Sequence, residues 1–227
     1  MKNLFSLKIK SFVLGRGRIT SSQRNAIDNH GDKWIIRLQK QADVENFFKK
    51  KATLTLEIGF GMGDALIDLA IKNPNDNFLG IEVYKSGIGK VLKKIEQHGI
   101  KNIRLIEGDA TDICRDVFVK NSFKNIYLFF PDPWPKKKHQ KRRIIQKDFV
   151  DSIANNLVLS GCFHCATDNE NYAQQMLVAL SNCKSLKNLS YKFSKRPNNI
   201  AISKFEKRAL ESGRKIFNLS FTKKLQT

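Results

Sequence analysis

The chain has 227 residues, which is long enough for one α/β domain with a well-buried core and short appendages. Its formal net charge of +20 favours a polyanionic partner. No apolar stretch is long enough for a signal peptide or a membrane span, so we expect a cytoplasmic protein without membrane contacts.

The positive charge is concentrated at the two ends of the chain and in one internal block. Residues 1–51 contain 12 Lys and Arg against 4 Asp and Glu, and residues 184–227 contain 12 against 2. Between them, residues 52–183 carry a net charge of only +2, and the block 136–143 alone holds six Lys and Arg. Solubility does not require such segregation, which favours nucleic-acid binding. We expect residues 1–51 to form a basic extension and residues 52–227 to form one domain.

Strand-like and helix-like segments alternate from residue 53 onward. Strands are predicted over 53–59, 77–83, 102–108, 125–132 and 161–168. Helices are predicted over 63–73, 86–99, 147–159 and 170–180. Two more strands, within 186–193 and 216–223, are expected to close the sheet. The alternation predicts a Rossmann-like α/β fold, with a mostly parallel seven-stranded sheet and helices on both faces.

Each of the first five predicted strands ends on or beside a carboxylate. These acids are Glu57, Glu82, Asp109, Asp132 and Asp168. Ligands of open α/β sheets bind outside the carboxyl ends of the strands, so the five acids are predicted to converge on one crevice. The alternative is that acids are simply common in loops. That alternative can explain one acid at a strand end, but it is a poor explanation for five.

The turn after the first predicted strand, LEIGFGMGDA, is rich in glycine. Gly59, Gly61 and Gly63 permit a tight turn and a close approach of the backbone to a ligand. The spacing G-x-G-x-G differs from that of dinucleotide-binding loops. Glu57, two residues before the first glycine, would repel a pyrophosphate and attract a cation. A nicotinamide cofactor is therefore disfavoured.

Two further acids indicate the rest of the ligand. Glu82 lies 19 residues after Gly63, where an acid accepts hydrogen bonds from ribose hydroxyls. Asp109, at the end of the third strand, is placed to accept from an adenine amino group. A ligand with a cation, a ribose and an adenine but no phosphate is S-adenosylmethionine, which the sequence predicts as cofactor.

The fourth predicted strand leads into FFPDPWPKKKHQKRR. Pro131 and Pro133 restrict the backbone on both sides of Asp132, so the position of its carboxylate is predicted to be fixed. The basic block that follows is suited to the phosphates of a nucleic acid. The alternatives are a helix-capping Asp132, a Trp134 in the core, and lysines that are ordinary surface charges.

Cys162 and Cys165 form a C-x-x-C pair, which can indicate a metal or redox site. They fall in a predicted strand, where residues three apart point to opposite faces. The two thiols therefore cannot bind one metal ion together, and no metal site is expected.

Over nearly its whole length the sequence resembles the bacterial tRNA (guanine-N7)-methyltransferases. The matching stretches are SFVLGRGRIT, LEIGFGMGDALIDLA, FLGIEVYKSGIGKVL, NIRLIEGDA, LFFPDPWPKKKHQKRRI, FHCATDNENYA and SKFEKRALESGRKI. The resemblance implies a class I S-adenosylmethionine-dependent methyltransferase domain over 52–227, which methylates N7 of guanine 46 in the variable loop of tRNA. It implies no obligate protein partner, and we expect a monomer or a homodimer.

The resemblance also implies roles for single residues. The catalytic acid would be Asp132. Cofactor contacts would come from Glu57, Gly59, Gly61, Gly63, Glu82, Asp109 and Ala110. Substrate contacts would come from Lys136, Asp168, Ser203, Lys204, Phe205 and Glu206. Independently of the resemblance, the charge of the basic block predicts RNA contacts from Lys137, Lys138, Lys141, Arg142 and Arg143. The sequence departs from the family pattern at Pro135, where His is usual, at Gly15, where a basic residue is common, and at Ser203, where Thr is usual.

This chemistry suits a fixed carboxylate. Guanine N7 bears no proton, so no general base is needed to create the nucleophile. The ring becomes cationic as it is methylated, so an anion held beside it stabilises the transition state more than the ground state. Asp132 suits that role, with Asp168 or Glu206 as a second acceptor. The base must leave the tRNA interior to reach the crevice, where Trp134 offers a stacking surface.

Two other functions are compatible with parts of the sequence. Methyltransferases of exocyclic amines carry N/D-P-P-aromatic after the fourth strand, which PDPW resembles without the adjacent prolines. A non-catalytic RNA-binding protein could retain the fold, but it would be expected to lose cofactor acids or glycines, and all of them are present.

Overall fold

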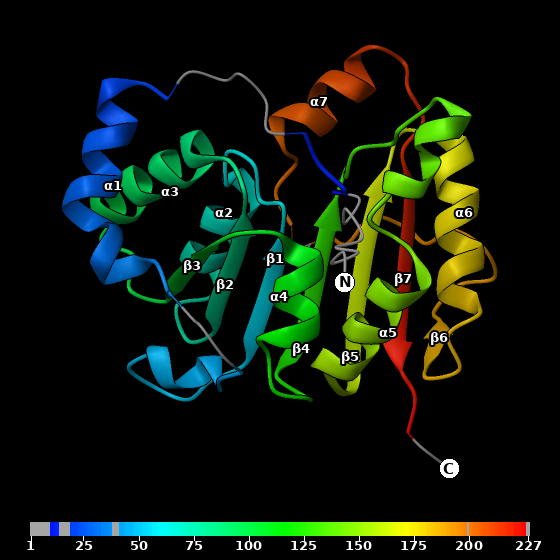
Figure 1. The fold of residues 1–227 in the computed structure, drawn as a ribbon, viewed down its shortest axis with the longest axis horizontal. Helices are drawn as coiled ribbons and strands as arrows, with labels where there is room; N and C mark the ends of the chain where they lie inside the picture. Colours follow the sequence, from blue (N-terminus) through cyan, green and yellow to red (C-terminus); the bar gives the residue numbers. More distant parts are fainter. Residues whose placement is uncertain (1–9, 14–18, 38–40, 199, 226–227) are drawn as a thin grey trace, which may run out of the picture.

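The computed structural model describes residues 10–13, 19–37, 41–198 and 200–225, and within them seven strands form a single sheet (Figure 1). The strands are β1 (Leu54–Ile58), β2 (Asn77–Glu82), β3 (Ile103–Glu107), β4 (Phe123–Phe129), β5 (Leu157–Thr167), β6 (Leu186–Asn188) and β7 (Phe217–Lys223). Their order in the sheet is β3-β2-β1-β4-β5-β7-β6. Strands β1 to β5 run parallel, and β7 is antiparallel to both of its neighbours. The predicted mostly parallel sheet is confirmed.

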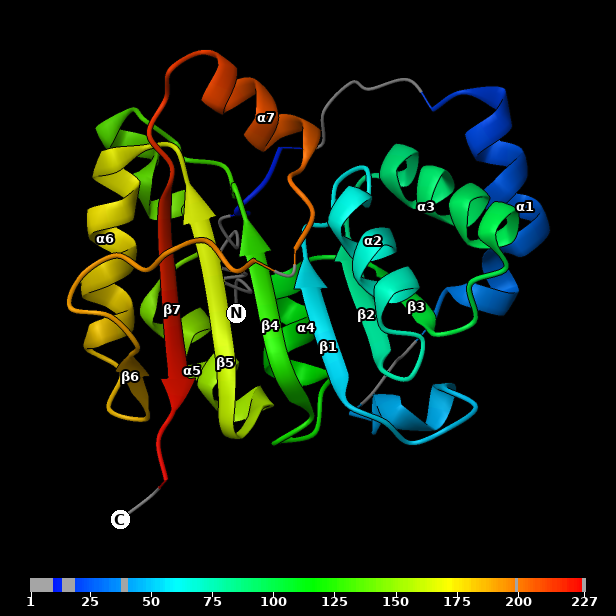
Figure 2. The same cartoon turned by 180° about the vertical axis from the view of Figure 1, so that it is seen from behind.

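Helices cover both faces of this sheet, as predicted (Figures 1 and 2). The helices are α1 (Ser21–Trp34), α2 (Asp64–Lys72), α3 (Lys85–His98), α4 (Ala110–Asp116), α5 (Lys147–Asn156), α6 (Glu170–Ser181) and α7 (Lys204–Glu211), with short 3-10 helices η1 (Val44–Phe47) and η2 (Lys137–Arg142). One apolar cluster joins the sheet to α4, α5 and α6, and a second joins the opposite face to α1, α2 and α3. Because both faces are covered, every residue of β1 and β2 is buried.

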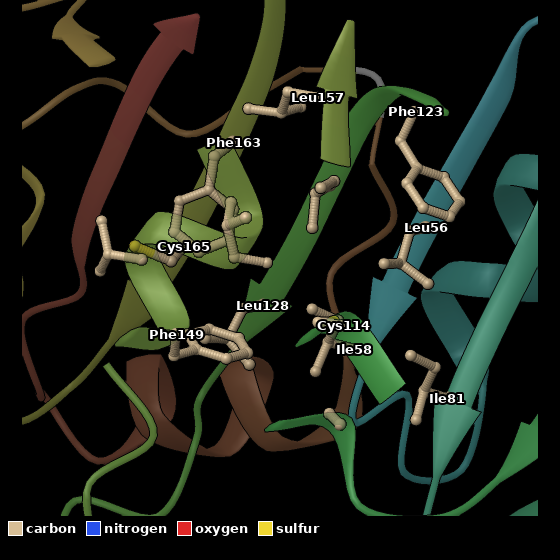
Figure 3. Close-up of a cluster of buried hydrophobic side chains, with 14 of the residues drawn as sticks. Leu56, Ile58, Ile81, Cys114, Phe123, Leu128, Phe149, Leu157, Phe163 and Cys165 are labelled. Carbon is tan, nitrogen blue, oxygen red and sulfur yellow. The ribbon is translucent and has the colours of Figure 1, made fainter. Parts of the chain in front are cut away.

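The core on the α4–α5 face is built from alternate residues of the central strands. Figure 3 shows Leu56 and Ile58 of β1 among side chains that include Ile81 of β2 and Cys114 of α4. Residues of β1 between these positions, such as Glu57, therefore point to the other face. On β5, Cys165 is buried and Cys162 is half-buried, which fits the predicted strand placement of this pair.

Several predicted boundaries differ from the structure. The helix predicted over 147–159 ends at Asn156, because Leu157, Val158 and Leu159 continue into β5. The strand predicted over 125–132 ends at Phe129, before the first proline. Of the strand expected within 186–193, only three residues form β6. Helices α1, α4 and α7 were not predicted.

Residues 19–37 pack against the sheet domain. Thr20 and Gln23 form a capping box that begins α1. Trp34 at its end is buried and donates from Nε1 to Oε1 of Glu96 on α3 at 2.6 Å. Ile36 then donates its backbone N–H to Leu105 of β3 at 2.7 Å. Residues 1–9, 14–18 and 38–40 of the predicted extension 1–51 lie outside the described residues, and its boundary at residue 52 stays a prediction.

Within the described ranges, no helix is long and apolar enough to cross a membrane.

Candidate active site

The site lies where the strand order of the sheet reverses, between the carboxyl ends of β1 and β4. Two adjoining cavities open there, of about 210 and about 330 Å³. Four residues line both of them: Gly59, Gly61, Phe129 and Phe130. The smaller cavity adds Glu82, Tyr84, Ala110 and Asp132, and the larger adds Glu57, Ser203, Lys204, Phe205 and Glu206. Most of the predicted cofactor and substrate residues therefore meet in one region.

The glycine loop between β1 and α2 adopts a backbone conformation that favours glycine. Gly59, Gly61 and Gly63 have φ angles of 66°, 54° and 72°. Glu82, at the end of β2, holds this loop, because its Oε2 accepts from the N–H of Gly61 at 2.7 Å. Its Oε1 accepts from the N–H groups of Val83 and Tyr84 at 2.7 and 3.1 Å. The loop is therefore shaped before any ligand arrives.

Glu57 of β1 is a buried carboxylate with an unpaired oxygen. Its side chain is 5% exposed, and Oε2 has no hydrogen-bond partner among the described residues. Burial, together with the charges of Glu82 and Asp64, raises the pKa of Glu57 to about 8. Asp64 itself is paired, since Lys94 donates to it at 2.8 Å. A buried acid without a partner is costly, so this position is suited to a ligand that brings a hydrogen-bonding cation.

The loop that carries Asp132 is held in an unusual conformation. Phe130 and Trp134, on its two sides, have φ angles of 52° and 43°, which non-glycine residues rarely adopt. Asp132 lines the smaller cavity at its open rim and is exposed. Partial desolvation raises the pKa of Asp132, and the positive charge of Arg142 opposes this effect. Asp132 caps none of the described helices, because the N-cap of the next one, η2, is Lys136.

The segment 10–13 lies across the same rim, which the residue patterns did not predict. Its backbone carbonyls accept three side-chain hydrogen bonds. Arg142 Nε donates to Lys10 at 3.1 Å, Trp134 Nε1 donates to Ser11 at 3.0 Å, and the Tyr84 hydroxyl donates to Val13 at 2.5 Å. Ser11 and Phe12 line the smaller cavity. The N-terminal part of the chain thus contributes a wall of the site.

Comparisons with known proteins agree with this geometry. A family model described as "Putative methyltransferase" matches residues 51–219. A tRNA (guanine-N(7)-)-methyltransferase of Bordetella pertussis is 41% identical over 214 residues, covering 94% of this chain and 84% of that protein. One from Buchnera aphidicola subsp. Acyrthosiphon pisum is 42% identical over 226 residues, covering 97% and 94%. The chain belongs to the tRNA (guanine-N7)-methyltransferase family.

Solved structures with similar coordinates extend the comparison to the fold. The 16S rRNA methyltransferase KamB matches with a TM-score of 0.61 at 14% identity, covering 83% of this chain and 97% of that one. The antibiotic-resistance methyltransferase Kmr matches with a TM-score of 0.59 at 11% identity, covering 84% and 96%. At such low identity the likeness shows the fold alone, which is the Rossmann-like class I methyltransferase fold.

Two acids that were predicted to contact a ligand, Asp109 and Asp168, already have partners within the protein. Asp109 caps α4, because its carboxylate accepts from the N–H and the hydroxyl of Thr111 at 2.9 and 2.6 Å. It lines a neighbouring cavity rather than the two described above, whereas Ala110 lines the smaller one. Asp168, at the end of β5, forms an ion pair with Arg214 and lines neither cavity.

The substrate residues predicted in SKFE form the start of α7, which lies above the carboxyl ends of the central strands (Figure 1). Ser203 caps this helix by accepting from the N–H of Glu206 at 3.1 Å. Glu206 is buried and paired with Arg196, whose Nε lies 2.6 Å from Oε1. Lys204 and Phe205 are exposed at the rim, and the Phe205 ring centre is 4.9 Å from that of Phe130.

The basic block separates into exposed and enclosed members. Lys136, Lys137, Lys138 and Lys141 are exposed, although Lys136 lines neither cavity. Arg142 is half-buried, with its guanidinium 4.2 Å from the ring centre of Trp134. Trp134 is thus already stacked on one face. The prediction that Arg143 contacts RNA does not agree with the structure, because its side chain is only 2% exposed and points into the protein.

Proposed function

We propose that this protein transfers a methyl group from S-adenosylmethionine to N7 of a guanine in tRNA, at position 46 of the variable loop. The observation that carries the proposal is the unpaired, buried oxygen of Glu57 beside the glycine loop. A phosphate-bearing cofactor brings neither a cation nor a donor to this oxygen. The α-ammonium group of S-adenosylmethionine supplies the missing donor and favours the ionised carboxylate. The relatives from Bordetella pertussis and Buchnera aphidicola, both named tRNA (guanine-N(7)-)-methyltransferase, support the same substrate.

The residues present fit this cofactor. Glu57 would bind the ammonium group, and Glu82, already fixed by three backbone N–H groups, would accept from the ribose hydroxyls. Gly59, Gly61 and Ala110 leave room for the adenosine in the smaller cavity. When bound, the cofactor supplies an electrophilic methyl group. Asp109 uses Oδ1 for both hydrogen bonds from Thr111, so its Oδ2 would accept from the adenine amino group.

Asp132 is the carboxylate suited to the guanine. In the described part of the chain it has neither a hydrogen bond nor an ion pair, whereas Asp168 and Glu206 are each paired with an arginine. A free anion at the rim can accept from N1–H and the 2-amino group of guanine, which lie on the edge opposite N7. It then orients N7 and stabilises the positive charge that develops on the ring. No proton has to be removed.

The tRNA would be held by phosphate contacts around the rim. The exposed lysines Lys137, Lys138 and Lys141 lie on η2, directly after the Asp132 loop. Lys204, Lys207 and Arg208 are exposed on α7, and Lys204 and Arg208 line the larger cavity. Positive charge on two elements at the site fits an extruded nucleotide whose flanking phosphates are bound.

Incubation of the purified protein with an unmodified tRNA transcript and labelled S-adenosylmethionine, followed by nucleoside analysis, tests the proposal. The expected product is 7-methylguanosine, and cleavage after borohydride and aniline treatment should map it to position 46. A matched transcript with adenine at that position should remain unlabelled. N6-methyladenosine, or no labelled nucleoside at all, would contradict the proposal.

A further inference from the structure

Arg143 is the one member of the basic block that is buried, at 2% exposure. Its guanidinium donates from Nε to the carbonyl of Pro133 at 2.8 Å. It also donates from Nη1 to Gln175 Oε1 at 2.6 Å and from Nη2 to Asn171 Oδ1 at 2.8 Å. The group lies 4.7 Å from the ring centre of Tyr172. All these partners are neutral, so the arginine is held by geometry and not by a counter-charge.

Pro133, whose carbonyl accepts from Arg143, directly follows the proposed catalytic residue. Pro133 is the neighbour of Asp132, and the five residues 131–135 include three prolines, which have no N–H to anchor the loop. Phe130 and Trp134 are in strained backbone conformations that need support from the surroundings. The hydrogen bond from Arg143 to the Pro133 carbonyl gives this loop a fixed point one residue from Asp132.

The other end of the contact is α6. Asn171 and Gln175 lie one helical turn apart on this helix, so they present two acceptors on one side. Figures 1 and 2 both show the segment after β4 lying beside the N-terminal end of α6. Asp168 lies two residues before α6 begins. The guanidinium therefore joins the loop of Asp132 to the helix that follows Asp168.

We propose that Arg143 is a positioning residue, which sets the place of Asp132 relative to α6 and does not contact tRNA. The inference rests on the proposed function, because it assumes that Asp132 orients the guanine. Only an arginine fits the site: its planar fork of donors serves three acceptors in different directions, whereas a lysine offers one charged tip. In the sequence, Arg143 cannot be distinguished from the exposed basic residues beside it.

The variant Arg143→Lys separates the two roles, because it keeps the charge and loses the fork. The single-turnover rate of methyl transfer at saturating tRNA and S-adenosylmethionine should fall on the order of 100-fold, the effect of a displacement of about 1 Å. The affinity for tRNA and its salt dependence should equal those of the parent. For comparison, Lys138→Gln should reduce the slope of log affinity against log salt by about 0.7–0.9, the contribution of one phosphate contact.

A second variant covers the case in which Arg143→Lys does not fold. Asn171→Ala removes one acceptor from an exposed position, and it should slow the single-turnover rate by a smaller factor with unchanged cofactor affinity. A saturated rate equal to the parent's in the folded variants would overturn the proposal. So would loss of tRNA affinity and of salt dependence in Arg143→Lys without a change in rate. Absence of 7-methylguanosine with the parent protein would instead contradict the proposed function.

Discussion

Oε2 of Glu82 lies 2.7 Å from the backbone nitrogen of Gly61, so the acid at the end of β2 fixes the glycine loop after β1. The same carboxylate also accepts from Val83 and Tyr84. One side chain thus ties together the two strand ends that form the floor of the smaller cavity. Burial raises the pKa of Glu82, and the three backbone donors oppose that effect.

Glu82→Ala should weaken S-adenosylmethionine binding by roughly 10- to 150-fold, the value of about 1.5–3 kcal/mol for a hydrogen bond to a charged group. The variant loses the acceptor for the ribose hydroxyls and the support of Gly61. Isothermal titration calorimetry with the folded variant measures the change. Unchanged affinity would show that Glu82 does not contact the cofactor.

Glu57→Gln should stabilise the cofactor-free protein while weakening cofactor binding. Burial raises the pKa of Glu57 from 4.5 to about 8. Between these values the folded state keeps a proton that the unfolded chain has released, so stability falls as pH rises. The variant avoids this loss. Its melting temperature should therefore exceed that of the parent above about pH 8 and approach it near pH 4.5.

Thermal unfolding of both proteins across this pH range, without cofactor, measures the effect. A constant difference in melting temperature at every pH would show that Glu57 is not the titrating group. In calorimetry at pH 8, the same variant should bind S-adenosylmethionine at least about 10-fold more weakly, because the amide has no charge to attract the ammonium group.

The positions of the strand-end acids could be predicted from the sequence, but their partners could not. Glu57 and Glu82 end apolar runs that are typical of central parallel strands, so sequence pattern alone placed them at one edge. Asp168 is paired with Arg214, which lies 46 positions further along the chain, and Glu206 with Arg196, which lies 10 positions before it. The side-chain acceptors of Arg143 on α6 lie 28 and 32 positions after it. No local pattern indicates such contacts, and a charged side chain that is already paired looks the same in a sequence as one that is free.

The unpredicted helices α1 and α7 are short of apolar residues, but both have recognisable first turns. Thr20 with Gln23 and Ser203 with Glu206 follow the S/T-x-x-E/Q pattern of a capping box. That signal was available in the sequence. Helix α4 is only seven residues long and is begun by Asp109, an acid that the strand-end pattern had indicated as a ligand contact.

Replacement of the exposed lysines Lys137, Lys138 and Lys141 by Gln should weaken tRNA binding and flatten its dependence on salt. Each lost phosphate contact lowers the slope of log affinity against log salt by about 0.7–0.9, so the total change should be about two to three. Cofactor affinity should stay as in the parent. Filter binding or fluorescence anisotropy at several salt concentrations gives the slope, and a curve that overlays the parent's would assign the lysines to ordinary surface.

Asp132→Asn should slow methyl transfer far more than it weakens tRNA binding. The amide keeps the shape and one acceptor but loses the charge that offsets the developing cation on guanine. A loss of about 3–4 kcal/mol, roughly 100- to 1,000-fold in the single-turnover rate, is expected by analogy with removal of one oxyanion donor. Since most tRNA affinity comes from phosphates, the binding constant should change much less. Equal losses in rate and affinity would contradict an electrostatic role.

The pH dependence of the single-turnover rate, at saturating cofactor and tRNA, tests most directly whether Asp132 orients the base or removes a proton. Partial desolvation raises the pKa of Asp132, but the residue is exposed at the rim and the positive charge of Arg142 opposes the shift, so we expect the carboxylate to be ionised at neutral pH. Since N7 has no proton to lose, the rate should be flat from about pH 6.5 to 8.5. A rate that rises about tenfold per pH unit across this range would show general-base catalysis and contradict the proposed mechanism.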